Sequence, residues 1–324
     1  MRLFRIVMIV LLLLAILFLV GPRIEINTTI EPLQIPEDIE LYLSETEQRF
    51  PDLKPGTKKA IIWANPAQKV ETPVAVVYLH GFSATRHEVA PLSELVAAQL
   101  GGNLYYGRLT GHGRSDDAMA EATVNAWIND AVEAVAIGER LGEEVVLIAS
   151  STGATLFTWL AANGHLSPEI SALILLSPNF GPANPTSEIL LWPWGEQIVR
   201  LVQGPYREWE PVNDQHAEFW TFRYPVAALL PVMGTVKLVR ESDLATVQQP
   251  LLMLYTTRDT SVNPQKIEAA FGQFGSQPKE LMAVTTEHAG GHVLAGDILS
   301  PSTTEPLAQT IVNFLIPILD APES

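Results

Sequence analysis

Cysteine is absent from this chain of 324 residues, and basic residues are scarce. Without cysteine the chain has no disulfide framework, no thiolate metal site and no cysteine nucleophile. Lys and Arg number 20 against 36 Asp and Glu, which gives a formal net charge of -16. Because binding to a phosphate backbone needs clustered Lys and Arg, we expect no nucleic-acid partner. The 47% of hydrophobic residues instead provides ample material for a large core.

A long apolar run begins the chain. Arg2 and Arg5 precede residues 6–20, which are fifteen consecutive apolar residues, and counting from Leu3 gives 18. As a helix the shorter run would be about 22 Å long, somewhat less than the roughly 30 Å of the hydrocarbon core. A cleaved secretory signal has a similar charged start and short apolar centre. Since no Ala-x-Ala-like site follows, we favour an uncleaved anchor over residues 1–22.

The charges around this run predict its orientation. Arg2, Arg5 and the terminal amine lie before it, whereas only Arg23 lies just after it and acidic residues follow. By the positive-inside rule the short end stays in the cytoplasm. The sequence therefore predicts a membrane-anchored protein with its large domain on the periplasmic or extracellular face.

Residues beyond the anchor divide into a spacer and a patterned region. Residues 23–58 are rich in proline, glutamate and polar residues, and we expect a spacer with a short helix at 38–48. From residue 59, apolar runs alternate with segments of helical periodicity, which is typical of an α/β fold with a parallel sheet covered on both faces. The expected strands are 60–63, 74–79, 103–107, 144–148, 171–176, 250–255 and 281–285. The expected helices are 87–100, 123–141, 154–163, 264–274 and 305–319.

One long segment, residues 181–243, interrupts this alternation. It has no clear buried strand, and it contains four of the seven tryptophans and seven prolines. A stretch of about 60 residues cannot be a plain loop in a compact domain. We therefore expect a helical cap at 181–243, inserted into a core formed by residues 59–180 and 244–320.

The most informative motif is A-S-S-T-G at residues 149–153, directly after an apolar run. Small residues lie two positions on either side of Ser151, as in a nucleophile elbow, a sharp turn from strand to helix that exposes a serine hydroxyl. Moving the frame to Ser150 would put Ile148 and Thr152 where small residues are needed. Ser151 is therefore the predicted nucleophile, although such a string taken alone is more often an ordinary loop.

Two further segments supply groups that acyl transfer by serine requires. The glycine of H-G-F-S at residues 80–83 lets the N–H of Phe82 face the nucleophile, and the N–H of Thr152 at a helix start is the second oxyanion donor. Asp259 follows the apolar run 251–255, where α/β active sites collect their residues. It is the best candidate acid, although a turn or helix cap is a common role for aspartate.

Two histidines, His288 and His292, are candidates for the base. Their spacing of four could place two metal ligands on a helix, but Gly290 and Gly291 between them disfavour a helix and no third ligand is nearby. We therefore expect neither a metal nor a cofactor. His292 directly follows the glycine pair, which allows a tight approach to Ser151, so His292 is the predicted base.

The order serine, aspartate, histidine, each after a strand, resembles the α/β-hydrolase family, and more narrowly its carboxylesterase and monoacylglycerol-lipase-like members. The segments that carry the resemblance are 79–82, 111–115, 149–153, 258–262 and 291–293. We expect His112 and Arg114 in the second of these to be structural.

This resemblance implies a mostly parallel eight-stranded sheet with helices on both faces, and a helical cap inserted after strand 6 that acts as a mobile lid. It also implies ester hydrolysis through an acyl-enzyme. The nucleophile is then Ser151, the acid Asp259 and the base His292, with oxyanion donors at Phe82 and Thr152.

The first functional hypothesis is a membrane-anchored serine hydrolase of carboxylic esters. The aromatic cap favours an apolar acyl group, and the nearby membrane suggests an acylglycerol or a lysophospholipid as substrate. A peptidase or thioesterase with the same three residues is an open alternative. A different class, a membrane-anchored binding protein that keeps the fold without turnover, is the second hypothesis.

Overall fold

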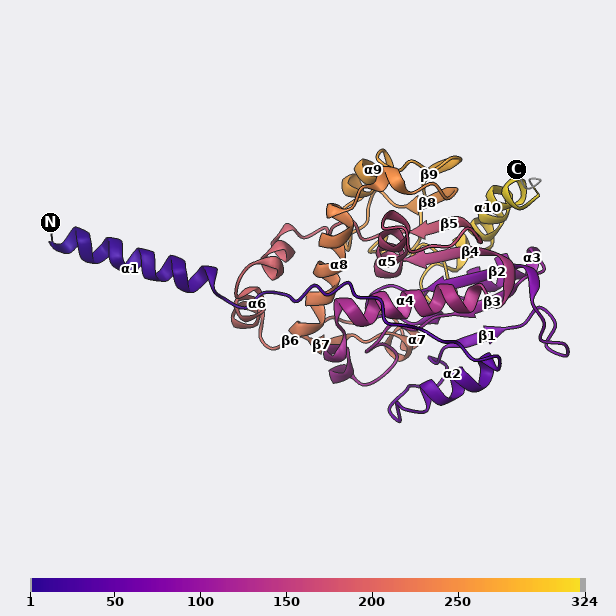
Figure 1. Cartoon of the computed structure of the whole chain (residues 1–324), viewed down its shortest axis with the longest axis horizontal. Coiled ribbons are helices and arrows are strands. Elements are labelled where there is room, and N and C mark those ends of the chain that lie inside the picture. The colour runs from indigo at the N-terminus through magenta and orange to yellow at the C-terminus, as the bar shows by residue number, and fades with distance from the viewer. Residues whose placement is uncertain (1, 321–324) are drawn as a thin grey trace.

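Seven strands form the central sheet of the computed structural model, which describes residues 2–320 of the chain (Figure 1). Their order in space is β1-β3-β2-β4-β5-β8-β9, and all neighbours are parallel except β1 and β3. The strands are β1 (Ala60–Ile62), β2 (Thr72–Leu79), β3 (Asn103–Tyr106), β4 (Gly142–Ser150), β5 (Ile170–Leu176), β8 (Leu251–Tyr255) and β9 (Lys279–Ala283). Each expected strand is found.

The expectation of an eighth strand is wrong for residues 2–320, where this sheet has seven. The segment before β1 contains Pro51 and Pro55 and forms no strand. Proline cannot donate a hydrogen bond to a sheet ladder, which is one physical reason why the sheet does not extend in this direction. The sheet therefore ends at the antiparallel strand β1.

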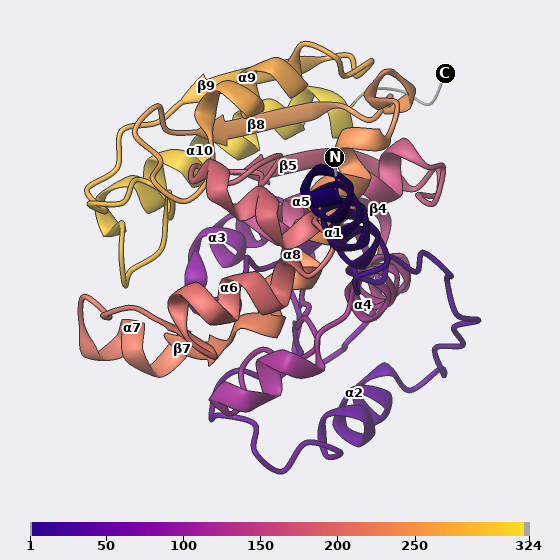
Figure 2. The same cartoon turned by 90° about the vertical axis from the view of Figure 1, so that its left-hand side faces the viewer.

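Alternating side chains of the central strands pack on opposite faces of the sheet, because successive residues in a strand point to opposite sides. Val77 and Leu147 face one core cluster, and Val76 and Val146 face the other. The first cluster contains residues of α4 (Val124–Gly138), α5 (Ser151–Ala162) and α9 (Pro264–Phe271), and the second those of α3 (Leu92–Gln99) and α10 (Pro301–Leu319). Helices thus cover both faces (Figure 2).

The cap, residues 181–243, lies between β5 and β8 and contains an antiparallel ribbon as well as helices. Its elements are η3 (Pro185–Leu191), α6 (Gly195–Gln203), β6 (Tyr206–Glu208), α7 (Asp214–Phe219), β7 (Arg223–Pro225), η4 (Val226–Ala228) and α8 (Leu229–Glu241). The expectation of a purely helical cap is therefore wrong in part, since strands of three residues are too short to show an alternating pattern. The cap follows β5, the fifth strand along the chain, and not the sixth.

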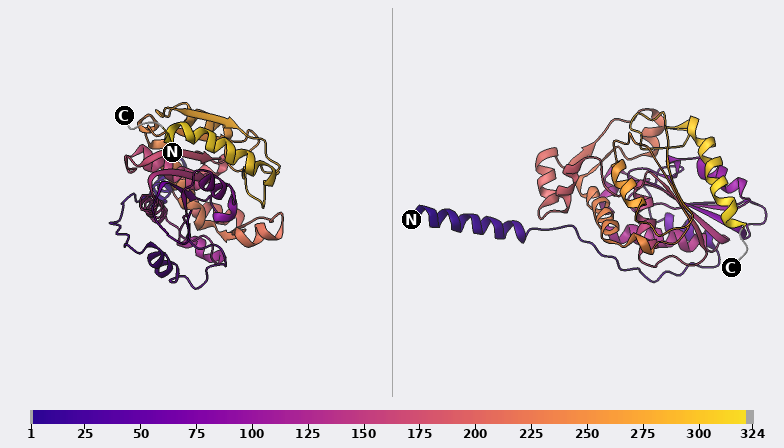
Figure 3. Two further views of the ribbon diagram at one scale, coloured as in Figure 1. Left: turned by 90° about the vertical axis from the view of Figure 1, so that its right-hand side faces the viewer. Right: turned by 90° about the horizontal axis from the view of Figure 1, so that it is seen from above.

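Helix α1 (Arg2–Leu19) projects from the rest of the protein beside the cap (Figure 3). None of its residues is buried, and its mean hydropathy of 2.7 makes it the one helix among residues 2–320 that is long and apolar enough to cross a membrane. Trp194 of the cap donates hydrogen bonds to the carbonyl oxygens of Leu17 and Pro22, at 3.0 and 2.8 Å. A short helix, α2 (Ile39–Glu47), lies in the spacer. The cap is thus tied directly to the end of α1.

Candidate active site

A strained turn at Ser151 joins β4 to α5. Its φ of +46° lies in the left-handed region, which residues other than glycine rarely adopt. A Cβ atom at Gly153 would lie 2.4 Å from the carbonyl oxygen of Leu79, so only glycine lets α5 pass this close to β2. Ser150 has an ordinary extended backbone, and its hydroxyl lies 3.0 Å from that of Tyr78. The geometry is that of a nucleophile elbow centred on Ser151.

Two backbone N–H groups beside Ser151 are free to bind an oxyanion. Thr152 is the second residue of α5, so its N–H has no partner within the helix. The N–H of Phe82 donates to no group of residues 2–320, whereas the N–H groups of Gly81 and Ser83 on either side each donate a hydrogen bond. A Cβ at Gly81 would lie 3.0 Å from the Ser151 Cβ. The loop that carries Phe82 therefore packs directly against the serine.

Two buried histidines support this loop from below. His112 Nε2 accepts a hydrogen bond from the N–H of Ser83 at 3.0 Å, and His80 Nε2 accepts one from the N–H of Leu109 at 3.2 Å. Burial lowers the pKa of His80 to about 4 and the pKa of His112 well below its ordinary value. Both rings are therefore neutral acceptors, which is consistent with a structural role for His112.

An acid and a base form a hydrogen-bonded pair next to the elbow. His292 Nδ1 and Asp259 Oδ2 are 2.7 Å apart, and Asp259 Oδ1 accepts the N–H groups of Ser261 and Val262 at 2.7 and 2.9 Å. Burial alone would raise the pKa of Asp259, but the charge of His292 and these hydrogen bonds keep it below its usual value. Burial likewise lowers the pKa of His292, but the charge and hydrogen bond of Asp259 together with the charge of Glu88 outweigh burial and raise it. The Asp259 carboxylate therefore stabilises the protonated form of the His292 imidazole.

The other candidate, His288, has no such partner. Its Nδ1 is buried without a hydrogen bond within residues 2–320, and burial lowers the pKa of its ring. Gly291 has a φ of +68°, and a Cβ there would lie 2.9 Å from Thr256, so the glycine permits the turn that separates the two histidines. The structure thus brings His292, and not His288, to Asp259.

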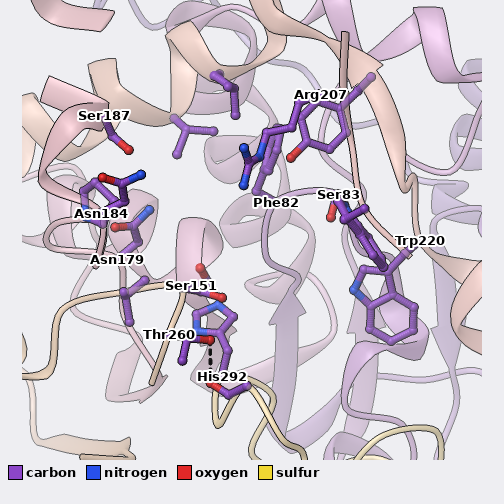
Figure 4. Close-up of a pocket in the computed structure, with 18 of the residues that line it drawn as sticks. Phe82, Ser83, Ser151, Asn179, Asn184, Ser187, Arg207, Trp220, Thr260 and His292 are labelled. Carbon is purple, nitrogen blue, oxygen red and sulfur yellow. Dashed lines mark hydrogen bonds between the residues drawn. The ribbon is translucent and has the colours of Figure 1, made fainter. Parts of the chain in front are cut away.

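Ser151 and His292 line one cavity of about 570 Å³. Figure 4 shows the Ser151 hydroxyl next to the imidazole ring. The two groups form no hydrogen bond within residues 2–320, and such bonds are commonly loose until a substrate is bound. Residues that are distant in the sequence thus meet at the carboxyl ends of β2, β4 and β8, as the order of the motifs predicts.

A buried acid that the sequence analysis missed, Glu88, lies beneath the loop that carries Phe82. Its Oε2 accepts the N–H of Gly81 at 2.8 Å and the hydroxyl of Tyr78 at 2.9 Å. Only 3% of Glu88 is exposed, and burial raises the pKa of its carboxyl group. In the sequence it follows Arg86 and His87 and looks like part of a charged surface turn. No local sequence pattern indicates that the third side chain of this turn, that of Glu88, points into the protein.

The cap provides much of the apolar part of the cavity wall. Trp209 and Trp220, two of its four tryptophans, line the cavity. Aliphatic side chains of η3, α6 and α8 also line it: Leu190, Val199, Leu229, Val232 and Met233. A cavity with such walls can hold an apolar acyl chain next to Ser151.

This fold and this arrangement of groups define a hydrolase of the α/β type. Residues 76–301 match the Alpha/beta hydrolase family, so the chain belongs to that family. It is 24% identical over 246 residues to the thermostable monoacylglycerol lipase of Bacillus sp. (strain H-257), which covers 75% of this chain and 92% of that protein.

Solved structures show the same fold. A structure from work on the metagenome-derived lipolytic enzymes LipS and LipT has a TM-score of 0.65 at 21% identity and covers 81% of this chain and 98% of its own. A soluble variant of the monoglyceride lipase of Saccharomyces cerevisiae has a TM-score of 0.58 at 15% identity, covering 91% of this chain and 99% of its own. The monoacylglycerol lipase of Paleococcus ferrophilus gives 0.56 at 17% identity, with 80% and 98% covered. The chain is thus lipase- and esterase-like in its fold.

Proposed function

We propose that this protein hydrolyses carboxylic esters with Ser151 as nucleophile. The observation that carries the proposal is the hydrogen-bonded pair of His292 and Asp259 next to a strained serine in one cavity. An activated serine needs a base, a group that orients the base, and donors for the developing oxyanion. Each of these is present among the residues that surround Ser151.

The proposed reaction proceeds in two halves. The Ser151 oxygen attacks the acyl carbon while His292 Nε2 takes the hydroxyl proton, and the N–H groups of Phe82 and Thr152 stabilise the oxyanion. When the intermediate collapses, the ester C–O bond breaks and His292 gives its proton to the leaving alcohol. A water molecule, deprotonated by His292, then attacks the acyl carbon. The bond from that carbon to the Ser151 oxygen breaks, His292 returns the proton to this oxygen, and the carboxylic acid leaves. Asp259 keeps the proton on Nδ1 throughout, so that Nε2 faces the serine.

The apolar cap wall supports an acyl ester of a lipid as the substrate, and the names of the similar lipases agree with this class. Helix α1, exposed along its whole length, supports attachment to a membrane. Because the excess of positive charge lies at the N-terminal end of α1, before its apolar run, we place the catalytic domain on the non-cytoplasmic side.

Labelling with a fluorophosphonate tests the nucleophile. We expect the wild-type protein to be labelled and to hydrolyse p-nitrophenyl esters, and Ser151→Ala to lose both. Ser150→Ala is the matched control and should still be labelled. Unchanged ester turnover in Ser151→Ala would refute the proposal.

The same assay with other substrates distinguishes ester hydrolysis from the other reactions that a serine triad can catalyse. Aminoacyl anilides and thioesters tested beside p-nitrophenyl esters would reveal a peptidase or a thioesterase. A folded wild-type protein whose Ser151 reacts with no organophosphorus probe would instead support a membrane-anchored binding protein.

A further inference from the structure

A single positive side chain, Arg207 of β6, projects into the cavity above Ser151 (Figure 4). It is the only lysine or arginine among the cavity-lining residues described within 2–320. The ion pairs found in this part of the chain do not include it. The chain has a net charge of -16, so a general excess of positive charge does not explain the presence of this cation in the cavity.

The antiparallel ribbon of β6 and β7 carries one arginine on each strand, and the two have different surroundings. Arg207 pairs in register with Tyr224, which also lines the cavity. Arg223 of β7 pairs in register with Glu208, lies 3.8 Å from an Asp116 oxygen, and has its guanidinium 3.8 Å from the centroid of the Tyr206 ring. Arg223 is thus used within the protein and does not line the cavity, whereas the charge of Arg207 is available to a ligand.

The other ionisable side chains that line the cavity do not neutralise Arg207. Glu88 lies at the base of the loop that carries Phe82, bound to Gly81 and Tyr78. Glu210 is exposed at the cavity wall and makes no ion pair with Arg207 within residues 2–320. Burial lowers the pKa values of His216, to about 4, and of His288, so both rings are neutral near pH 7. The remaining ionisable groups are the proposed base and the phenol of Tyr224, whose pKa is raised by burial, so that the phenol is neutral near pH 7.

A second, independent feature of the cavity is the side chain of Asn179. It is 6% exposed, and its Oδ1 is buried without a hydrogen-bond partner in the described part of the chain. Its backbone is held in place, because its N–H donates to the Ser151 carbonyl at 3.2 Å and its carbonyl accepts the Thr155 hydroxyl at 2.9 Å. A buried amide oxygen without a partner is unfavourable, and a hydroxyl group on a bound ligand would satisfy it.

We propose that the alcohol portion of the substrate carries a phosphate, bound by Arg207, and a free hydroxyl, bound by Asn179. An acylated glycerophosphate has both groups, so the substrate class is a lysophospholipid with a net negative headgroup and not a neutral acylglycerol. The guanidinium can donate two parallel hydrogen bonds to phosphate oxygens, and the apolar cap wall holds the acyl chain. This inference rests on the proposed ester hydrolysis at Ser151.

Matched soluble esters test this inference with the full-length protein in a neutral detergent. The substrates are 1-hexanoylglycerol, 1-hexanoylglycerol 3-phosphate and the zwitterionic phosphocholine ester of the latter. We expect kcat/KM to be highest for the phosphate. Arg207→Gln should reduce the preference for phosphate over the neutral ester by about tenfold or more, mainly through KM, because a charged hydrogen bond is lost. Arg207→Lys should retain part of the preference, and the control Arg223→Gln should retain all of it.

Asn179→Ala gives a second readout. It should reduce the preference for 1-hexanoylglycerol 3-phosphate over the hexanoyl ester of 3-hydroxypropyl phosphate, which lacks the free hydroxyl. Thermal unfolding of each variant shows whether it is folded.

Equal turnover of the three glycerol esters by the wild-type protein, or an equal loss on all of them in Arg207→Gln, would overturn the inference and leave the serine hydrolase intact. A preference for the phosphocholine ester would also overturn it, since it indicates a zwitterionic headgroup. If p-nitrophenyl hexanoate and all glycerol esters are left uncleaved, the proposed function itself fails and this inference fails with it.

Discussion

The carboxyl group of Glu88 accepts a hydrogen bond of 2.8 Å from the backbone N–H of Gly81. Gly81 immediately precedes Phe82, whose N–H is the proposed oxyanion donor. The same carboxyl oxygen accepts the hydroxyl of Tyr78, which in turn contacts Ser150 in the elbow. One buried acid therefore connects the loop that carries Phe82, β2 and the turn that carries Ser151.

Replacing this acid should weaken both folding and catalysis. Glu88→Ala leaves the Gly81 N–H and the Tyr78 hydroxyl without their acceptor, so we expect a loss of about 1–3 kcal/mol in the free energy of unfolding and a lower kcat. Glu88→Gln keeps an acceptor oxygen and should restore most of both. Urea denaturation and p-nitrophenyl ester kinetics measure the two effects. Glu143→Ala, which removes an exposed carboxylate, is the control, and a Glu88→Ala protein as stable as this control would contradict the prediction.

The carboxylate of Asp259 should matter for catalysis far more than for folding. In Asp259→Asn the amide no longer stabilises an imidazolium at His292 and does not enforce the tautomer with a proton on Nδ1. We expect kcat to fall by about 10³–10⁴ while the protein remains folded. Steady-state kinetics and circular dichroism measure this, with the exposed Asp297→Asn as control. Activity within a few fold of wild type would show that another group orients the base.

The pH dependence of kcat/KM should report the raised pKa of His292. The base works only when its imidazole is neutral, so activity rises as the pH increases through this pKa. Because Asp259 and, to a smaller extent, Glu88 outweigh burial and hold the pKa above the ordinary 6.5, the midpoint of the acid limb should lie above pH 6.5. In Asp259→Asn burial dominates, and the midpoint of the residual activity should shift to lower pH. A wild-type midpoint below 6.5 would contradict the assignment.

The close approach of α5 to β2 predicts a steric effect at Gly153. A Cβ there would lie 2.4 Å from the Leu79 carbonyl oxygen and 2.8 Å from that of His80, and backbone atoms cannot move aside cheaply. Gly153→Ala should therefore destabilise the protein by about 1–3 kcal/mol or more and displace Ser151. Gly272→Ala is the matched control, since the nearest atom to a Cβ there, the Ala269 carbonyl oxygen, would be 3.6 Å away. Thermal unfolding measures both, and an equal Tm for the two variants would contradict the prediction.

Helix α1 should keep the protein in the membrane. The substitutions Leu11→Arg and Leu14→Arg each place a charge in the middle of α1. Each raises the free energy of membrane insertion by about 2.5–3.5 kcal/mol on the scale for insertion at a helix centre. We expect the wild-type chain to resist extraction by alkaline carbonate and the double variant to be released. Leu41→Arg on α2, which is 54% exposed, is the control and should behave like wild type. A mature chain that lacks residues 1–22 would show instead that the segment is a cleaved signal.

Local patterns in the sequence were sufficient to predict the class of fold and the position of the strained serine. The central strands β2, β3, β4, β5 and β8 are visible as apolar runs because a parallel strand covered on both faces must be largely apolar. Ser151 could be distinguished from Ser150 because the turn requires small residues at positions 149 and 153, which is a steric demand within five residues. The order in which Ser151, Asp259 and His292 follow their strands was enough to suggest one site.

Only the tertiary structure showed which groups meet. The contact of His292 with Asp259 across 33 residues, the burial of Glu88 and the cavity-facing position of Arg207 depend on pairings between distant segments. The seven-stranded sheet and the short ribbon of β6 and β7 likewise depend on which backbones pair. Side chains of the same type, such as Arg207 and Arg223, have no distinguishing local pattern, because their environments are set by neighbours that the fold brings from elsewhere in the chain.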